Sequence, residues 1–439
     1  MRKKLLTLLL IFCFVVSSAG FAAASKSAGT TKMAKKDLTI WAWGADAEAK
    51  SRENVIKIFI KEHPELNVKY SVIPTANNAW DQKAAAALAA GNGPDVMQMS
   101  PDYYGMRTKY FEDLNPYVKK DHLNLSKLLA PGFINGYYDT DGKLEGFPLL
   151  ANCFVVAYNK DMFDKAKVPY PKSGWTMADL LKWGKPFVGG SGAKQTYALA
   201  KHWSMDLLML YAGGGTPYTN NLSKSNMGSK QILNALSLYG KLIKGGYVPT
   251  SAAQKSTSAE TLFISGLSAM YTLGGMESDS VIADAEKNGI HLGFCAMPSG
   301  LDGKEINLQF ATGWAITKTS QNKEAAWQFL KESAYANKDM CKATCACGMT
   351  SSIEVANDYY AKLTIGKSKF SNSWYVNHMG KTHLNPWGGT LSSSGDLWGK
   401  MIDAVTINGQ DPAKVQATYA PQIEGLFSSY KFTTKKGGN

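Results

Sequence analysis

The first hundred residues alternate between short apolar segments and amphipathic ones, and this alternation limits the fold more than any other feature. Residues 38–43 form a short apolar run, and residues 67–73 alternate apolar with polar side chains. Between them, apolar residues recur at helical spacing, and an Ala-rich stretch at 80–90 then leads to another apolar run at 95–99. This order predicts α/β units with parallel strands, in which ligands bind beyond the carboxyl ends of the strands.

The rest of the chain continues this mixture of elements without an internal repeat. Further strands are predicted at 144–147, 154–158, 267–271, 290–296 and 310–316, and helices from 162 and at 177–183, 205–212, 229–243, 259–264 and 323–334. The 415 residues that follow residue 24 exceed what one compact core usually organises, so we expect two domains.

The N-terminus has the pattern of a secretory signal peptide. Basic residues at 2–4 precede an apolar run at 5–16, and three alanines end the segment 1–24. The apolar run has about 12 residues, too few to cross a bilayer. We therefore expect an exported protein, periplasmic or at the extracellular cell surface. Residues 25–36 are mostly Ser, Ala, Gly, Thr and Lys and predict a flexible leader.

The charge of the chain is strongly basic. The formal net charge is +13, and loss of the three basic residues of the signal peptide would leave +10. The lysines are scattered singly, and the densest clusters are the pairs at 35–36 and 435–436. Because no basic stripe is interleaved with aromatic residues, we expect no nucleic-acid partner and interpret the lysines as a solvated surface.

The cysteines favour structural roles over metal binding. Cys13 lies in the apolar run behind Phe12, whereas lipid attachment needs small residues before the cysteine, so no anchor is expected there. Within the cluster at 341–347 no Cys-x-x-Cys pair occurs, and no histidine lies within about thirty residues of it. A disulfide from Cys341 to one of its two neighbours and buried thiols remain the alternatives. The five cysteines after the signal peptide are Cys153, Cys295, Cys341, Cys345 and Cys347.

Catalytic and cofactor motifs are absent. The segment 266–270 fails the Gly-x-Ser-x-Gly pattern at its last position, and no His-Glu-x-x-His occurs. The glycine-rich segment 189–194 lacks the ending of a phosphate-binding loop. Residues 139–145 are too short for a calcium loop and predict a turn. We therefore expect no metal, no cofactor and no enzymatic activity.

Aromatic residues are the positive signal. The chain has 11 Trp and 21 Tyr, and several follow predicted strands, where a core does not need them. Trp43 ends the first strand, Tyr103 follows a later one, and Trp314 lies in another. Sugars stack their C–H faces on aromatic rings, and their hydroxyl groups need polar partners, so these positions favour a sugar site. Tryptophans in helical stretches are expected in the core: Trp183, Trp327 and Trp398.

An ordered series of short motifs resembles one family, the extracellular solute-binding proteins of ABC importers, in the branch that includes maltose-binding protein. Each motif alone is loose, whereas the ordered series across almost the whole chain is specific. The motifs lie at 38–44, 89–96, 111–114, 142–148, 158–163, 269–270, 297–298, 313–316 and 322–326.

The resemblance implies a fold, a mechanism and partners. It implies a two-lobed α/β fold, each lobe a sheet flanked by helices, in which a hinge closes the lobes on a ligand. One lobe would comprise residues 37–149 with 296–345, and the other 150–295 with 346–439. The implied partners are a sugar, more specifically an oligosaccharide, and the permease subunits of an ABC transporter, with the protein itself a monomer.

The resemblance also implies ligand-binding positions along the cleft. Maltose-type members carry a carboxylate where this chain has Asn152 and a Trp where it has Met276, which argues against maltose itself. The implied ligand-binding residues are Trp43, Gly44, Asp46, Asp102, Tyr103, Asn152, Trp203, Ser204, Gly274, Glu277, Gly313, Trp314, Trp374 and Trp387.

Two rival functions remain open at this point. The same fold can bind an acidic or phosphorylated sugar or a polyamine, although an anion site would need cations and only Arg52 and Arg107 follow the signal peptide as arginines. A glycan-cleaving enzyme would need two carboxylates at catalytic separation, for which Asp46 and Asp102 are the candidates.

Overall fold

A computed structural model gives the fold. It describes residues 35–44, 46–75, 79–101, 109–130, 132–139, 141–219, 224–254, 256–384 and 392–429. The predicted signal peptide and nearly all of the predicted leader lie outside these residues.

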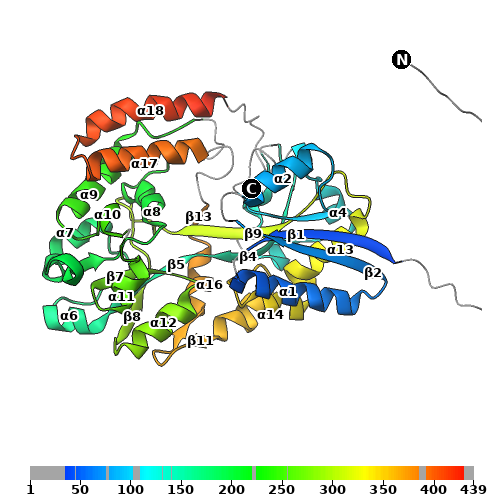
Figure 1. Cartoon of the computed structure of the whole chain (residues 1–439), viewed down its shortest axis with the longest axis horizontal. Helices are drawn as coiled ribbons and strands as arrows, with labels where there is room; N and C mark the ends of the chain where they lie inside the picture. The colour runs from blue at the N-terminus through cyan, green and yellow to red at the C-terminus, as the bar shows by residue number, and fades with distance from the viewer. Residues whose placement is uncertain are drawn as a thin grey trace, which may run out of the picture. The chain divides into compact units, whose positions relative to one another are not determined.

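One sheet has seven strands and combines segments from distant parts of the sequence (Figure 1). Its order is β10-β4-β9-β3-β1-β2, with β13 paired to β9. The pairs β1–β2 and β1–β3 are parallel as predicted, whereas β9 runs antiparallel to β3 and β4. The strands are β1 (Lys36–Trp43), β2 (Leu66–Ile73), β3 (Val96–Met99), β4 (Phe147–Asn152), β9 (Leu308–Ile316), β10 (Met349–Thr350) and β13 (His383–Leu384).

Helices from two separate stretches of the sequence, residues 46–137 and 323–344, accompany the seven-stranded sheet. The predicted inward face of α13 is confirmed, because Ala326, Phe329 and Leu330 are buried. Phe329 packs edge-on against Phe59 and Trp314, with ring centroids 5.1 and 5.3 Å apart. The helices are α1 (Asp46–Glu62), α2 (Ala79–Ala89), α4 (Asn115–Lys120), α5 (Leu125–Leu128), α13 (Lys323–Lys331) and α14 (Lys338–Thr344), with 3₁₀ helix η2 (Asn135–Tyr137) and π-helix η6 (Glu332–Ala336).

The second sheet has four strands in the order β6-β7-β5-β8. β5 is antiparallel to both β7 and β8, and β6 is parallel to β7. Every residue of β5 and β7 is buried, in agreement with their nearly continuous apolar sequences. The strands are β5 (Phe154–Asn159), β6 (Tyr197–Leu199), β7 (Ser268–Gly274) and β8 (Leu292–Cys295).

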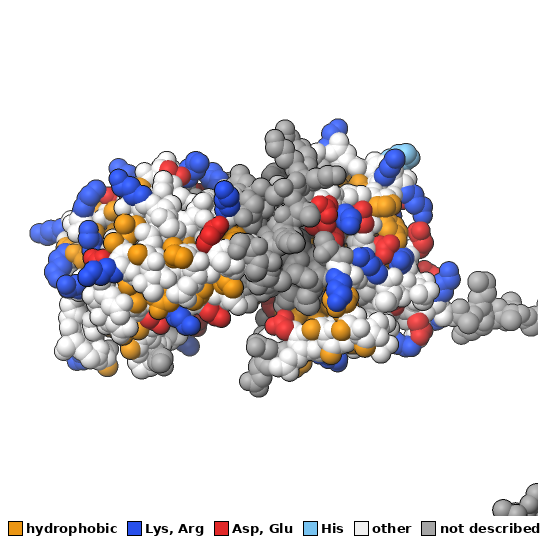
Figure 2. Space-filling model, turned by 90° about the horizontal axis from the view of Figure 1, so that it is seen from above, with side chains coloured by type: hydrophobic (Ala, Val, Ile, Leu, Met, Phe, Trp, Pro, Cys, Tyr) orange, Lys and Arg blue, Asp and Glu red, His pale blue; other side chains and the backbone are white. Residues whose placement is uncertain are grey.

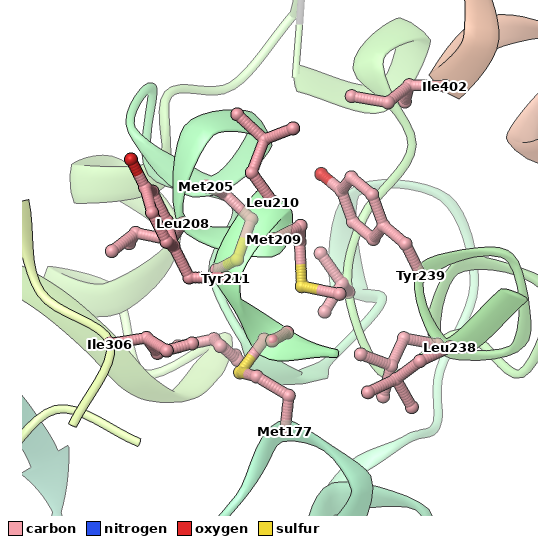
Figure 3. Packing of buried hydrophobic residues seen from close by; sticks show 14 of the residues in the cluster. Met177, Met205, Leu208, Met209, Leu210, Tyr211, Leu238, Tyr239, Ile306 and Ile402 are labelled. Carbon is pink, nitrogen blue, oxygen red and sulfur yellow. The ribbon is translucent and has the colours of Figure 1, made fainter. Parts of the chain in front are cut away.

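Helices pack on this sheet and on one another. α8, α9 and α17 meet in a core that contains Met209, Tyr239 and Ile402 (Figure 3). The helices are α6 (Lys160–Ala166), α7 (Leu180–Trp183), α8 (Met205–Ala212), α9 (Lys230–Lys244), α10 (Ser251–Gln254), α11 (Ala259–Ile264), α12 (Ser278–Lys287), α17 (Ser392–Thr406) and α18 (Pro412–Ser429), with 3₁₀ helices η3 (Met177–Asp179), η4 (Lys185–Phe187) and η5 (Gly192–Lys194).

A third group of short elements follows β10. The helices are α15 (Ile353–Asp358), 3₁₀ helix η7 (Tyr360–Lys362) and α16 (Ser373–Met379), and β11 (Thr364–Ile365) pairs antiparallel with β12 (Phe370–Ser371). The sequence analysis predicted none of these, nor α12, α14, α17 and α18.

The chain passes from the seven-stranded to the four-stranded sheet at Cys153, which separates β4 from β5. Asn307, just before β9, ties the two crossing segments together. Its Oδ1 accepts a hydrogen bond from the Phe154 N–H at 3.0 Å, and its Nδ2 donates to the Phe154 carbonyl at 2.8 Å. The predicted lobe boundaries stay a prediction, while the strands locate the first change of sheet at Cys153.

Two local predictions about loops and cysteines can be compared with the structure. Asp139 Oδ1 accepts hydrogen bonds from the backbone N–H groups of Asp141 and Lys143, both at 2.8 Å, so the segment forms the predicted turn. The five described cysteines are all buried and none forms a disulfide, so the disulfide alternative does not occur. Within the described ranges, no helix is long and apolar enough to cross a membrane, and no three metal-ligating side chains cluster.

Candidate functional site

A hollow lies beside the paired strands β4 and β9. Its volume is about 610 Å³, which includes space open to solvent. The pairs Leu150–Thr312 and Asn152–Phe310 of the β4–β9 ladder contribute to its wall. Met276, from the loop after β7, reaches it from the four-stranded sheet. Its lining residues are Glu48, Ser100, Pro101, Leu150, Asn152, Met276, Gln309, Phe310, Ala311 and Thr312.

Three lining side chains carry buried polar atoms without a hydrogen-bond partner: Asn152 Oδ1, Gln309 Nε2 and Thr312 Oγ1. The other ends of the two amides are fixed, because Asn152 Nδ2 donates to the Cys347 carbonyl at 3.0 Å and Gln309 Oε1 accepts from Thr382 Oγ1 at 3.0 Å. An unsatisfied buried polar group costs about 1–3 kcal/mol, and native proteins contain few. Three in one wall mark a place where a polar partner would be stabilising, although each of these atoms is covered in this conformation.

Asn152 is held between two glycines. A Cβ atom added to either Gly275 or Gly348 would lie 2.5 Å from Asn152 Oδ1, closer than atoms can approach. Only glycine therefore fits at these two positions while Asn152 keeps its orientation. Because Gly275 follows β7 and Gly348 precedes β10, the carbonyl oxygen of Asn152 lies between backbone from both sheets.

Exposed apolar side chains lie beside these polar groups. Trp203 is 61 % exposed, although tryptophan is usually well covered. Its ring centroid lies 4.7 Å from that of Phe310, which in turn packs 5.6 Å from Phe154. Met276 is 55 % exposed. The Phe310 contact thus supports an indole ring with a free face, next to the lining of the hollow.

A buried polar network fixes the loop that carries Met276. The Glu277 carboxylate accepts hydrogen bonds from the Gly274 N–H at 3.0 Å and from Tyr271 Oη at 3.1 Å. Burial raises the pKa of Tyr271, and the negative charge of Glu277 raises it further. His202 Nε2 lies 3.3 Å from Glu277 Oε1 without hydrogen-bond alignment, and His202 Nδ1 lies 2.6 Å from Ser204 Oγ.

This Ser204–His202–Glu277 series has the composition of a hydrolase triad but not its accessibility. Ser204 is 0 % exposed and His202 is 2 % exposed, so no substrate carbonyl reaches the hydroxyl oxygen in this conformation. The network supports the loop instead.

The residues predicted at strand ends have different environments. Trp43 is half-buried and packs edge-on against Trp80, with ring centroids 5.0 Å apart, and Gly44 follows it. The backbone N–H of Trp43 donates to Gln98 Oε1 at 3.1 Å. Asp46 begins α1, but its side chain lies outside the description, as do residues Asp102, Tyr103 and Trp387 entirely.

Trp314 does not fit its predicted role as a ligand contact. Its side chain is fully buried, and a Cβ at the neighbouring Gly313 would lie 2.2 Å from the Phe147 carbonyl oxygen. The Trp314 side chain projects from the face of the sheet that α13 covers, and it packs against Phe329 there, which is why Trp314 serves the core. Trp374 is half-buried and stacks on His378, with ring centroids 5.7 Å apart.

Most of the lining of the hollow was not predicted from the sequence. Of its lining, only Asn152 was among the predicted ligand-binding residues, and Met276 was considered only as a departure from the family pattern. Gln309 and Thr312 were not among the predicted binding residues, although polar residues in an otherwise apolar strand are a usable signal. Glu48 lies in a helix where no local pattern marks it.

Two α/β sheets linked by crossing segments, with a hollow lined from both, define a solute-binding class of protein. The family model of the bacterial extracellular solute-binding proteins matches residues 39–333, and the chain belongs to this family.

Individual relatives are distant. The galactooligosaccharide-binding protein of Bacillus subtilis is 24 % identical over 336 residues, which cover 74 % of this chain and 75 % of that protein. The sn-glycerol-3-phosphate-binding periplasmic protein UgpB of Brucella suis is 23 % identical over 302 residues, which cover 65 % of this chain and 66 % of that protein. A solved structure of an ABC substrate-binding protein of Listeria monocytogenes in complex with cycloalternan has a TM-score of 0.74 at 21 % identity, covering 89 % of this chain and 98 % of that one.

Proposed function

We propose that this chain is the exported binding component of an ABC importer and that it binds a neutral oligosaccharide in the hollow. The observation that carries the proposal is the combination of three unsatisfied polar side chains with an exposed tryptophan nearby. In a conformation that uncovers these atoms, Asn152 Oδ1 can accept from a sugar hydroxyl, Gln309 Nε2 can donate to one, and Thr312 Oγ1 can do either. The free face of Trp203 suits the C–H face of a sugar ring.

The charge of the lining favours a neutral ligand over an anionic one. Among the described residues of the lining, Glu48 alone carries a charged side chain. The buried cation behind it, Arg52, lies 3.6 Å from the Glu48 carboxylate and is 2 % exposed. A phosphate or carboxylate in the hollow would meet the Glu48 charge first. We therefore rank an oligosaccharide, the ligand class named for the Bacillus subtilis relative, above the glycerol phosphate named for the Brucella suis relative.

Closure of two lobes would supply the transport signal. Ligand contacts from Met276 and Trp203 on one side and from Asn152 and Thr312 on the other are complete only when the two sides approach. Binding would then shift the equilibrium toward a closed form, which a membrane permease recognises. The crossing segments at Cys153 and Asn307 would act as the hinge.

Native mass spectrometry of the purified protein tests the ligand class, because tightly bound solutes survive purification. We expect a carried-over neutral oligosaccharide, and calorimetry with a panel of neutral, acidic and phosphorylated sugars should give heats with neutral members. Tighter binding of glycerol phosphate or a uronic acid would overturn the neutral class. Failure of every glycan, together with unchanged small-angle scattering, would overturn sugar binding.

Enzymatic cleavage is the second candidate and needs a separate assay. The composition of the Ser204–His202–Glu277 series is the feature that suggests catalysis. The burial of Ser204 argues against it and favours a binding role. Incubation with oligosaccharides should release no new reducing ends above a heat-inactivated control. Release that a substitution at Asp46 or Asp102 abolishes would replace the binding proposal with a hydrolase.

A further inference from the structure

The positive charge of the chain is concentrated in one segment. Residues 160–250 contain 12 lysines, no arginine and four aspartates, so this segment alone has a net charge of +8. Residues 35–159, by contrast, contain 14 basic and 15 acidic residues and carry a net charge of −1. The excess charge therefore belongs to the half around the four-stranded sheet.

Six of these lysines lie on neighbouring elements and define what we call the lysine face: Lys165, Lys167, Lys185, Lys194, Lys241 and Lys244. All six are exposed. They come from α6, η4, η5 and the last turn of α9, with Lys167 directly after α6. In Figure 2, Lys and Arg side chains gather at the left end, which is the end where Figure 1 shows α7 and α9.

Packing brings these elements together although they are distant in sequence. The ring of Phe163, in α6, lies 4.6 Å from that of Phe187, at the end of η4. Tyr247, just after α9, donates from Oη to the Leu181 carbonyl of α7 at 3.5 Å. The Ala198 N–H, beyond the loop that carries Lys194, donates to the Tyr247 carbonyl at 3.0 Å.

The carboxylates next to the lysine face are already engaged. Asp161 pairs with His291 at 2.8 Å, Asp164 accepts from Tyr170 Oη at 2.8 Å, and Asp179 pairs with Lys182 at 2.7 Å. None of the six lysines has a carboxylate within ion-pair distance among the described residues. Asp164 keeps its negative charge, because the Tyr170 hydroxyl is neutral, but the six lysines outnumber the neighbouring carboxylates and the face stays positive.

We propose that the lysine face docks on a membrane surface rich in anionic phospholipid. Two features favour this partner. The cations are all lysines, which act as hydrated point charges suited to diffuse attraction, whereas specific phosphate recognition favours the planar fork of arginine. They are also spread over four elements instead of lining a groove, so they can reach many headgroups at once. Such contact would hold the protein near a membrane permease.

Vesicle sedimentation tests the proposal. The chain without its predicted signal peptide is required, because the apolar run at 5–16 would insert by itself. We expect binding to vesicles of phosphatidylglycerol and phosphatidylcholine, none to phosphatidylcholine alone, and release by 1 M NaCl, where the screening length falls to about 3 Å.

A matched pair of variants separates the lysine face from net charge. Each lysine near an anionic surface changes partitioning by a factor of about five. Lys→Gln at all six positions should therefore weaken binding at least a hundredfold. The control carries Lys→Gln at six exposed, unpaired lysines of the other half, and it should stay within about threefold of the parent. These control positions are Lys36, Lys50, Lys61, Lys119, Lys127 and Lys143.

Three results would overturn the proposal. They are equal losses in both variants, no binding to anionic vesicles, and tighter binding to soluble polyphosphate than to vesicles of equal charge. Calorimetric sugar binding and thermal unfolding should be unchanged in both variants. Failure of this proposal is therefore distinguishable from failure of the proposed sugar site.

Discussion

The two sides of the hollow are built in different ways. The side on the seven-stranded sheet includes the strand residues Asn152 and Thr312, whose polar atoms are buried and unsatisfied. On the side of the four-stranded sheet, Met276 lines the hollow and Trp203 lies beside the lining, and both are loop residues with exposed apolar surface. A strand side chain is held by two neighbouring strands, whereas a loop side chain can move with its half of the molecule.

This difference suggests that one side sets the specificity for the ligand and the other adds affinity. Buried polar groups discriminate between ligands, because a ligand without matching hydroxyls leaves them unpaired. Exposed aromatic surface adds affinity with less discrimination, since stacking accepts many rings. The following predictions test whether the two sides differ in this way, starting with the largest effect.

Replacing Trp314 by alanine should lower the free energy of unfolding by about 3–5 kcal/mol, because the ring is fully buried and leaves a cavity. Replacing Trp203 by alanine should change it by no more than about 0.5 kcal/mol, because most of the ring is exposed. Urea unfolding of both variants measures the difference. Equal destabilisation would remove the distinction between a core tryptophan and a binding tryptophan.

Thr312→Val removes an unsatisfied hydroxyl without changing the shape of the side chain. Stability should be unchanged or rise by up to about 1 kcal/mol, while sugar affinity falls about tenfold. The control is Thr317→Val. Its hydroxyl donates to the Pro94 carbonyl at 2.7 Å, so its loss should cost about 1–3 kcal/mol and leave affinity alone. Destabilisation by Thr312→Val would contradict the idea of a surface that awaits a ligand.

Trp203→Ala should weaken sugar binding by up to about tenfold without changing the order of preference among sugars, because stacking contributes about 0.5–1.5 kcal/mol beyond area. Titration calorimetry with two neutral oligosaccharides measures both quantities. Trp203→Phe keeps a smaller ring and should recover part of the affinity. A changed preference would assign discrimination to the loop side as well.

The smallest effect concerns pH and the strand side. Burial raises the pKa of Asp95, but hydrogen bonds from Ser320 and Thr39 outweigh it, so the net pKa is lowered. A carboxyl with a lowered folded pKa contributes stability above its unfolded pKa, and this contribution is lost as the pH falls through the folded value. The stability gap between the parent and Asp95→Asn should therefore narrow below about pH 4. A gap that is constant from pH 7 to 3 would contradict this.

Local sequence determined the elements that stabilise themselves by their own periodicity. The strands β1 and β2 were predicted within two residues and a helix was predicted between them, because the apolar spacing switches cleanly between strand and helix. The helix at α9 followed from the same signal. The short strands β10 and β13 were not predicted, because two residues carry no period and exist only through their partners.

The tertiary structure alone decided which side chains are buried and where charges gather. Trp203 and Trp314 have equal chemistry in the sequence, yet the packing of α13 on the sheet buries Trp314, while the loop before α8 exposes Trp203. The lysines of residues 160–250 look scattered along the chain, and packing of α6 against η4 and of Tyr247 against α7 gathers them. Sequence fixes period and composition because these are local, whereas burial and charge density depend on contacts between residues that the chain brings together only when folded.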